Sequence, residues 1–255
     1  ARDSFLPLER ITEAAGSISD GDDLSARLDL RRGPREMRRL ARTFDGMFAR
    51  LETSFLSKKQ FTADASHELR TPVAVILAEC DRARRKAETK EDFLASINVI
   101  EQQGNKMNTL IEQLLSLTRI QQGTEKYPLR VCDLSGFVDA CCDEFVPADE
   151  RGMTLETDIE PGVAAAYNPS LLSRAMFNLM QNAYKYGREG GNIRVSLCQE
   201  NGCAVISVKD DGPGIPKAEQ EKIWQRFYRC DTSRAEGGTG LGLSLVREIA
   251  LVHHA

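Results

Sequence analysis

The sequence predicts a multidomain protein, in which an all-α dimeric coiled coil and four-helix bundle is followed by an α/β sandwich. Two observations predict this division. Apolar residues recur at helical spacing as far as Leu117, in narrow stripes typical of paired helices. From Tyr127 onward, short β-rich runs are mixed with helical patterns, which is typical of helices packed on one face of a mixed sheet.

The bulk composition describes a protein with packed cores. The chain has 255 residues, 41% of them hydrophobic and 28% charged, which is enough for roughly two domains of ordinary size. A net charge of -4 gives no reason to expect nucleic acid as a partner. The seven cysteines form no Cys-x-x-Cys pair, which argues against a disulfide framework or a zinc site and for a reducing compartment. No signal peptide is visible, and no apolar run reaches the ~18 residues of a membrane span.

The N-terminal stretch predicts two helices joined by a connector. The apolar residues of the first recur at three- and four-residue spacing, at Leu8, Ile11, Ala15 and Ile18, before Gly21–Asp23 breaks the pattern. The second follows Gly33-Pro34 and has the heptad spacing of a coiled coil, at Met37, Leu40, Phe44, Met47 and Leu51. No glycine or proline separates Leu51 from His67, so this helix is expected to run on into the next segment.

A helical hairpin comes next. Pro72 lies inside the helical pattern and removes the backbone bond to the carbonyl of Glu68, so we expect a bend just after His67. After a turn near Glu88–Lys90, a second long helix carries one apolar stripe, formed by Phe93, Ile97, Ile100, Met107, Leu110, Leu114 and Leu117. Such narrow stripes bury little by themselves, and pairing two hairpins into a four-helix bundle would cover them. The sequence therefore predicts a homodimer.

Beyond Tyr127, the predicted strands are Leu129–Leu134, Thr154–Ile159, Ile193–Gln199 and Cys203–Lys209. The last two are separated by an Asn-Gly hairpin signal at Asn201-Gly202. The predicted helices are Ser135–Phe145, Pro169–Tyr186, Lys217–Trp224 and Leu241–Val252. This mixture predicts the α/β sandwich.

His67 is the strongest candidate for a nucleophile. The other two histidines close the chain, whereas His67 is followed directly by Glu68, with Thr71 one helical turn on. A carboxylate that accepts from one ring nitrogen fixes the tautomer and stabilises the cation that develops on attack. Thr71 would hold a water for the reverse reaction, hydrolysis of the phosphoryl group that such a nucleophile had accepted. Taken alone, a His-Glu pair is more often a surface histidine, and the whole run from Phe61 to Pro72 favours the functional interpretation.

Three later segments carry residues that suit a nucleotide. Side-chain oxygens at helical spacing suit Mg²⁺, and a nearby lysine suits phosphate. A carboxylate after a strand selects adenine, and a glycine-rich loop opening a helix binds phosphate through its amides. These candidates are Asn178, Asn182, Lys185, Tyr186, Asp210, Gly212, Gly214, Ile215, Gly238, Thr239, Gly240, Leu241 and Gly242. The structural alternatives are an amphipathic helix with a polar outer face and ordinary glycine turns.

Between these segments, Ile223–Arg229 combines aromatic residues with arginines and is followed by polar Asp231–Glu236. This pattern indicates a hinge and a lid. The alternative is that Trp224 and Phe227 form a hydrophobic plug.

Together these motifs resemble a bacterial two-component sensor histidine kinase. Residues 1–55 resemble a HAMP linker, 56–124 a dimerisation and histidine phosphotransfer hairpin, and 125–255 a Bergerat-type ATP-binding catalytic domain. The family's H box matches at His67, its N box at Asn178–Tyr186, its G1 box at Asp210–Ile215, its F box at Ile223–Arg229 and its G2 box at Gly237–Leu243. Five boxes in the family's order make the resemblance specific.

The resemblance implies the chemistry. Asn182 would ligate Mg²⁺, Asp210 would contact adenine, and Gly240 and Gly242 would lie beside phosphate. The γ-phosphoryl group of ATP would pass to His67 and then to an aspartate in the receiver domain of a response regulator, which the protein would also dephosphorylate. The chain would be the cytoplasmic portion of a bacterial inner-membrane protein, preceded by a transmembrane and sensor segment and followed by two further strands.

Two other functions fit parts of the pattern. A dimeric coiled-coil adaptor would keep the nucleotide site for structure alone and would not turn over ATP. An ATPase of the same nucleotide-binding fold would transfer the phosphoryl group to water, independently of His67.

Overall fold

The computed structural model describes residues 27–30, 34–86, 89–121, 123, 127–145, 151–230 and 238–255. The chain divides into two compact units, Ala1–Glu68 and Leu69–Ala255. The predicted first helix, its connector at Gly21–Asp23 and the predicted lid at Asp231–Glu236 lie outside the described residues.

The first described helix, α2 (Arg35–Lys86), is continuous over 52 residues. As predicted, it carries the heptad region and His67 without a break, and it also continues on both sides of Pro72, whose side chain is fully buried. Glu36 in the first turn places a negative charge at the positive end of the helix dipole.

The second long helix, α3 (Lys90–Gln121), begins with a reciprocal capping arrangement. The amide of Asp92 donates to the Thr89 hydroxyl at 3.2 Å, and the amide of Thr89 donates to the Asp92 carboxylate at 3.2 Å. Leu110 and Leu117 of the predicted stripe are buried, whereas Ile97 is 54% exposed. The stripe is therefore covered only in the C-terminal half of the helix.

A mixed three-stranded sheet forms the centre of the α/β domain. Its order is β2 (Thr154–Ile159), β4 (Asn192–Glu200), β5 (Cys203–Lys209), with β2 and β4 parallel and β4 and β5 antiparallel. Asn201 and Gly202 connect the last two strands with φ values of 50° and 80°. Two positive φ values are what a type I′ hairpin turn requires, so the predicted Asn-Gly turn is confirmed.

A second sheet pairs β1 (Arg130–Asp133) with β3 (Ala164–Tyr167) in antiparallel register. The sequence did not predict β3, because its three alanines favour helix over strand. Asp133 ends β1 and caps α4 (Leu134–Glu144) by accepting from the amide of Gly136 at 3.1 Å.

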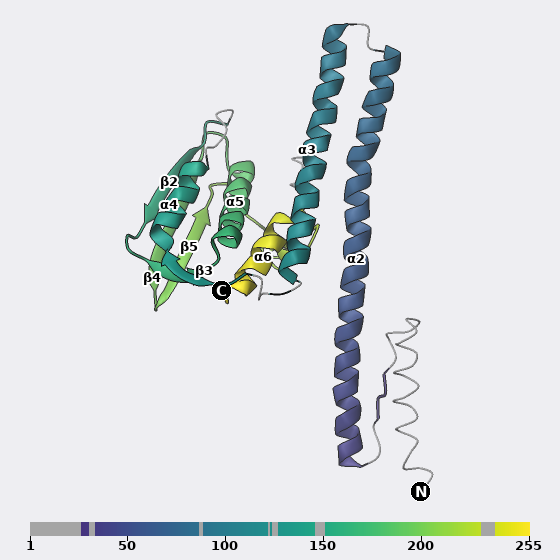
Figure 1. Cartoon of the computed structure of the whole chain (residues 1–255), viewed down its shortest axis with the longest axis vertical. Coiled ribbons are helices and arrows are strands. Elements are labelled where there is room, and N and C mark those ends of the chain that lie inside the picture. Colours follow the sequence, from purple (N-terminus) through teal and green to yellow (C-terminus); the bar gives the residue numbers. More distant parts are fainter. Residues whose placement is uncertain are drawn as a thin grey trace. The chain divides into compact units, whose positions relative to one another are not determined.

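Helices α4 and α5 (Pro169–Tyr186) cover one face of the mixed sheet, as Figure 1 shows, so the predicted sandwich is confirmed. The core between them includes side chains that are at most 1% exposed, among them Val138, Met176, Met180, Val195 and Leu197. Asn168 caps α5 by accepting from the amide of Leu171, and α6 (Gly242–Val252) packs beside α5.

The helix predicted at Lys217–Trp224 is wrong. Only Lys222–Trp224 is helical, and it is a single 3₁₀ turn, η4. Hydrogen bonds from Glu219 to Pro216 and from Lys222 to Glu219 span three residues, so the chain makes successive tight turns here. Within the described ranges, no helix combines the length and apolar character needed to cross a bilayer.

All seven cysteines are free thiols in this structure. Cys141 and Cys142 lie buried in the core, and burial raises the pKa of Cys142 to about 11. Burial also raises the pKa of Cys141, whereas Cys203 at the hairpin is exposed.

We expect iodoacetamide at pH 8 to alkylate Cys203 in the folded protein and to spare Cys141 and Cys142. The thiolate is the reacting form, and a raised pKa combined with burial removes it. Peptide mass spectrometry before and after unfolding measures the difference. Comparable native labelling at Cys142 and Cys203 would contradict the packing of α4.

Candidate active site

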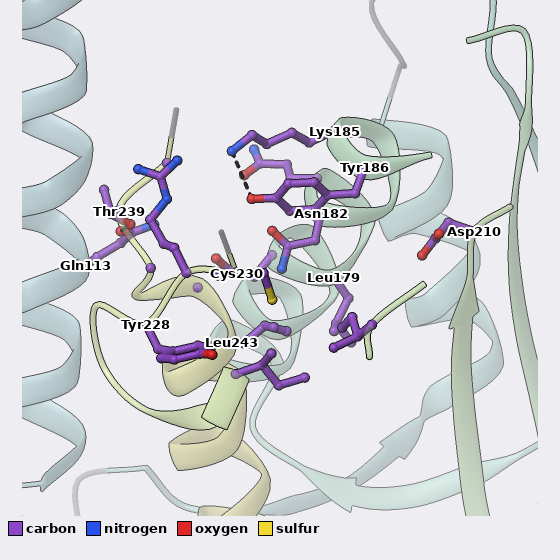
Figure 2. Close-up of a pocket in the computed structure, with 18 of the residues that line it drawn as sticks. Gln113, Leu179, Asn182, Lys185, Tyr186, Asp210, Tyr228, Cys230, Thr239 and Leu243 are labelled. Atoms are coloured by element: carbon purple, nitrogen blue, oxygen red, sulfur yellow. Dashed lines mark hydrogen bonds between the residues drawn. The ribbon is translucent and has the colours of Figure 1, made fainter. Parts of the chain in front are cut away.

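A cavity of about 510 Å³ lies in the second unit, beside α5 and the N-terminal end of α6 (Figure 2). All the predicted nucleotide residues except Gly212 and Leu241 line it, and they are Asn178, Asn182, Lys185, Tyr186, Asp210, Gly214, Ile215, Gly238, Thr239, Gly240 and Gly242. Segments far apart in the sequence therefore meet at one site. The volume lies within the range of small-ligand pockets, about 300 to 1,000 Å³.

One face of α5 supplies polar groups to the cavity. Asn178 donates its amide N–H to the carbonyl of Arg174 at 2.7 Å, and its side-chain oxygen is directed towards Gly242. A Cβ atom at Gly242 would lie 2.9 Å from that oxygen. Asn182 lies one turn along the same face and points into the cavity (Figure 2). A side chain at position 242 would therefore displace the Asn178 amide or the start of α6.

The positively charged side chain of Lys185 lies at the glycine-rich side of the cavity. The ammonium group of Lys185 donates to the Tyr186 hydroxyl at 3.0 Å and lies 4.7 Å from the ring centroid (Figure 2). It also lies so close to Gly238 that a Cβ there would be 2.7 Å from it. A positive charge beside backbone amides suits an anionic group such as a phosphate.

Asp210 lies at the opposite side of the cavity, directly after β5 (Figure 2). Its carboxylate accepts from the amide of Gly212 at 2.9 Å, which closes a local turn. A Cβ at Gly212 would collide with the carbonyl oxygen of Tyr186, so Gly212 lies behind the cavity wall. Apolar Leu179 and Ile215 line the same cavity and suit a flat base.

The N-terminal end of α6 is held by backbone contacts. Gly240 has a φ of 67°, and its carbonyl accepts from the amide of Phe227 at 2.9 Å. The Thr239 hydroxyl accepts from the amide of Leu241 at 3.3 Å, and the Leu241 side chain is fully buried. Leu241 therefore supports the loop from behind. The first amides of α6 remain suitable for anion binding.

Some lining residues have no signal in the sequence. Lys106, Thr109 and Gln113 of α3 line the cavity, and Gln113 accepts from the Thr239 hydroxyl at 2.6 Å. They lie on the polar face of an ordinary helix, so no local motif distinguishes them. Tyr228 also lines the cavity, and its place in the aromatic segment before the predicted lid was the only indication.

The predicted phosphoacceptor residues lie on α2. His67 is exposed, Glu68 is half-buried, and Thr71 is exposed one helical turn further on. His67 and Glu68 belong to the first compact unit, and the cavity belongs to the second.

A divalent cation at this site would need amide and phosphate oxygens. In the described part of the chain, no three His, Cys, Asp or Glu side chains gather in a group that could hold a metal ion. Asn182 and its neighbour Asn178 offer amide oxygens in the cavity, and Mg²⁺ commonly combines one or two protein oxygens with substrate phosphates. The residues present fit a metal that enters with its nucleotide.

The fold and the cavity define a nucleotide-binding α/β domain joined to a helical hairpin, and three family matches agree. The family described as Histidine kinase-, DNA gyrase B-, and HSP90-like ATPase matches residues 167–255, which implies ATP binding. The His Kinase A (phospho-acceptor) domain matches residues 57–123, and the HAMP domain matches residues 1–53. The chain belongs to the sensor histidine kinases.

Similar proteins carry the same description. Sensor histidine kinase RppB of Synechocystis is 37% identical over 205 residues, which are 78% of this chain and 45% of RppB. Sensor protein CutS of Streptomyces coelicolor is 34% identical over 253 residues, which are 97% of this chain and 60% of CutS. The chain thus spans about half the length of the curated relatives it matches.

A solved structure supports the fold. Histidine kinase ThkA in complex with response regulator protein TrrA matches with a TM-score of 0.64 and 23% identity, over 81% of this chain and 57% of that one.

We expect Gly242→Ala to weaken ATP binding about tenfold, or ~1.4 kcal/mol. The added methyl group forces the Asn178 oxygen or the start of α6 to move. Isothermal titration calorimetry measures the change. Gly104→Ala is the matched control, because Gly104 lies in α3 with open space at its Cβ, and it should leave affinity unchanged. Equal affinity of Gly242→Ala and the unaltered protein would contradict this geometry.

Proposed function

We propose that this chain is the kinase portion of a two-component sensor, which transfers the γ-phosphoryl group of ATP to His67. The convergence of the nucleotide candidates on one cavity carries the proposal, together with a phosphoacceptor candidate exposed on a separate helix. We place the HAMP linker at residues 1–55, the phosphotransfer hairpin at 56–124 and the catalytic domain at 125–255.

His67 acts as the nucleophile. One ring nitrogen forms a bond to the γ-phosphorus, the bond from phosphorus to the bridging oxygen breaks, and ADP leaves. The other ring nitrogen keeps its hydrogen and donates a hydrogen bond to the Glu68 carboxylate, which stabilises the ring as it gains positive charge. Exposure of His67 on α2 supports this role, because both the nucleotide and a protein acceptor must reach the ring.

The cavity residues bind and orient the nucleotide. Asp210 accepts from the exocyclic amine of adenine, and Leu179 and Ile215 contact the base. Lys185 and the first amides of α6 bind the phosphates. Asn182 is the ligand for Mg²⁺, which supplies neutralisation of phosphate charge. Tyr186 holds the Lys185 ammonium group within reach of the glycine-rich loop.

The phosphoryl group then passes to an aspartate in the receiver domain of a response regulator. Thr71 positions a water for the reverse reaction, hydrolysis of the phosphorylated regulator, since it lies one turn from His67 on an exposed face of α2. The structure of ThkA with a response regulator supports a partner of this class.

A second copy of the chain covers the apolar surface of α2 and α3. Large apolar side chains of these helices are 44% to 64% exposed in the single chain, including Leu51, Phe55, Leu77, Ile97 and Leu115. Their stripes match the pairing of two hairpins in a four-helix bundle. We place this homodimer at the cytoplasmic side of a bacterial inner membrane, below a transmembrane and sensor segment.

We expect His67→Gln to abolish acid-labile incorporation of phosphate from γ-labelled ATP and to leave ATP affinity unchanged. Glutamine keeps helix propensity but offers no nucleophile. His254→Gln is the matched control, because His254 is also exposed, and it should retain labelling. Continued labelling of His67→Gln would exclude His67 as acceptor, and phosphate release at an unchanged rate would favour an ATPase.

We expect Asp210→Asn to lower ATP affinity at least tenfold and to reduce the preference for ATP over GTP. Asparagine is isosteric and still accepts from Gly212, but its amide N–H₂ faces the donor of adenine unfavourably and can serve the guanine oxygen. Competition binding with both nucleotides measures the ratio. Asp158→Asn on β2 is the control. An unaltered ratio would show that Asp210 does not read the base.

A further inference from the structure

The C-terminal end of α5 lacks the usual glycine cap. Gly187 follows the helix with a φ of -64° and ψ of 164°, so the chain leaves in an extended conformation. A left-handed glycine would have returned amides to the last carbonyls. The amide of Gly187 reaches only the carbonyl of Ala183, at 2.8 Å. The carbonyls beyond Ala183 therefore need other donors.

Arg151 supplies those donors. Its guanidinium group donates to the carbonyl oxygens of Tyr184, Lys185 at 2.7 Å and Gly187 at 2.9 Å. It also lies 5.5 Å from the centroid of the Tyr184 ring. A rigid planar cation that binds three carbonyls at a helix C-terminus is favoured by both hydrogen bonding and the helix dipole.

Asp211 holds the loop that follows. Its carboxylate accepts from the amides of Arg188 at 3.1 Å and Asn192 at 3.2 Å. These bonds, the one from Arg188 first, lower the pKa of Asp211, which favours the charged carboxylate. Gly191 packs against this carboxylate with no room for a Cβ.

The two charged side chains act on one loop from opposite ends. The carbonyl of Arg151 accepts from the amide of Gly190 at 2.8 Å, so its main chain also joins the loop that Asp211 binds. Between them, the carbonyl of Tyr186 lies against Gly212, next to Asp210. The loop thus connects the last turn of α5 to the strand end that carries Asp210.

We propose that Arg151 and Asp211 are positioning residues for nucleotide binding. Neither lines the cavity. Arg151 binds the main-chain carbonyl of Lys185, which does line it, and Asp211, the neighbour of the lining residue Asp210, binds the loop that follows α5. Arg151 sets Lys185 and Tyr186 at the phosphate side, and Asp211 sets the distance from that turn to Asp210. This inference rests on the proposed function, because it takes the cavity as the ATP site.

The test compares Arg151→Ala and Arg151→Lys with the unaltered chain. We expect Arg151→Ala to weaken ATP binding about tenfold and to raise the KM for ATP with little change in kcat. Arg151→Lys should lose less than Arg151→Ala, because its ammonium group still donates to part of this carbonyl set, although it cannot serve all three. Millimolar guanidinium should restore part of the affinity of Arg151→Ala, because it refills the same site.

Arg194→Ala is the matched control, since Arg194 pairs with Glu156 on the exposed sheet and does not line the cavity. Its ATP affinity should stay unchanged and insensitive to guanidinium. If Arg151→Ala fails to fold, Asp211→Asn replaces it, with the same expected rise in KM.

Lower thermal stability of Arg151→Ala with full ATP affinity would overturn the proposal and leave a purely structural role. Hydrogen exchange at residues 185–191 separates this failure from failure of the proposed function. If the unaltered chain does not bind ATP, the proposed function fails. In that case, faster exchange at residues 185–191 in Arg151→Ala would still support the inference that Arg151 fixes this loop. Unchanged exchange there would overturn that inference.

Discussion

The packing of α5 on the sheet is the constraint on which the site depends. Met176 and Met180 are almost fully buried against Val195 and Leu197, and each such burial contributes roughly 1.5 to 3 kcal/mol. A helix repeats every 3.6 residues, so a residue two positions further on faces nearly the opposite way. Burial of the methionines therefore turns the asparagine face of α5 towards α6, and the core sets the direction of the polar groups.

The fold could be predicted from the sequence where local chemistry and tertiary packing agree. The Asn201-Gly202 turn and the start of α5 at Pro169 are local features, and both form as predicted. Strand β3 could not be predicted, because its alanines are extended only through pairing with β1, far away in the sequence. The segment Lys217–Trp224 has helical spacing, but successive three-residue turns replace the helix.

The candidate site was predicted to a similar extent and for the same reason. Residues inside short motifs, such as Asn182 and Lys185, reach the cavity because a single helix face carries them. Gly212 also belongs to a motif, yet its amide serves Asp210 and its Cα adjoins a backbone carbonyl, so it shapes the wall from behind. Gln113 and Arg151 could not be found, because their contacts join distant segments and follow no spacing rule.

The contacts that assemble the site are largely made by the main chain. The amide of Phe227 donates to the carbonyl of Gly240, Gly212 adjoins the carbonyl of Tyr186, and the Arg151 guanidinium group donates to three main-chain carbonyls. Backbone groups are present at every position, so a motif records such contacts only as an absent side chain or as a distant charge. A change in the residues that hold these backbones would therefore alter the cavity even where every motif residue that lines it is kept. The motif residues line the cavity, and the supporting contacts decide whether they meet.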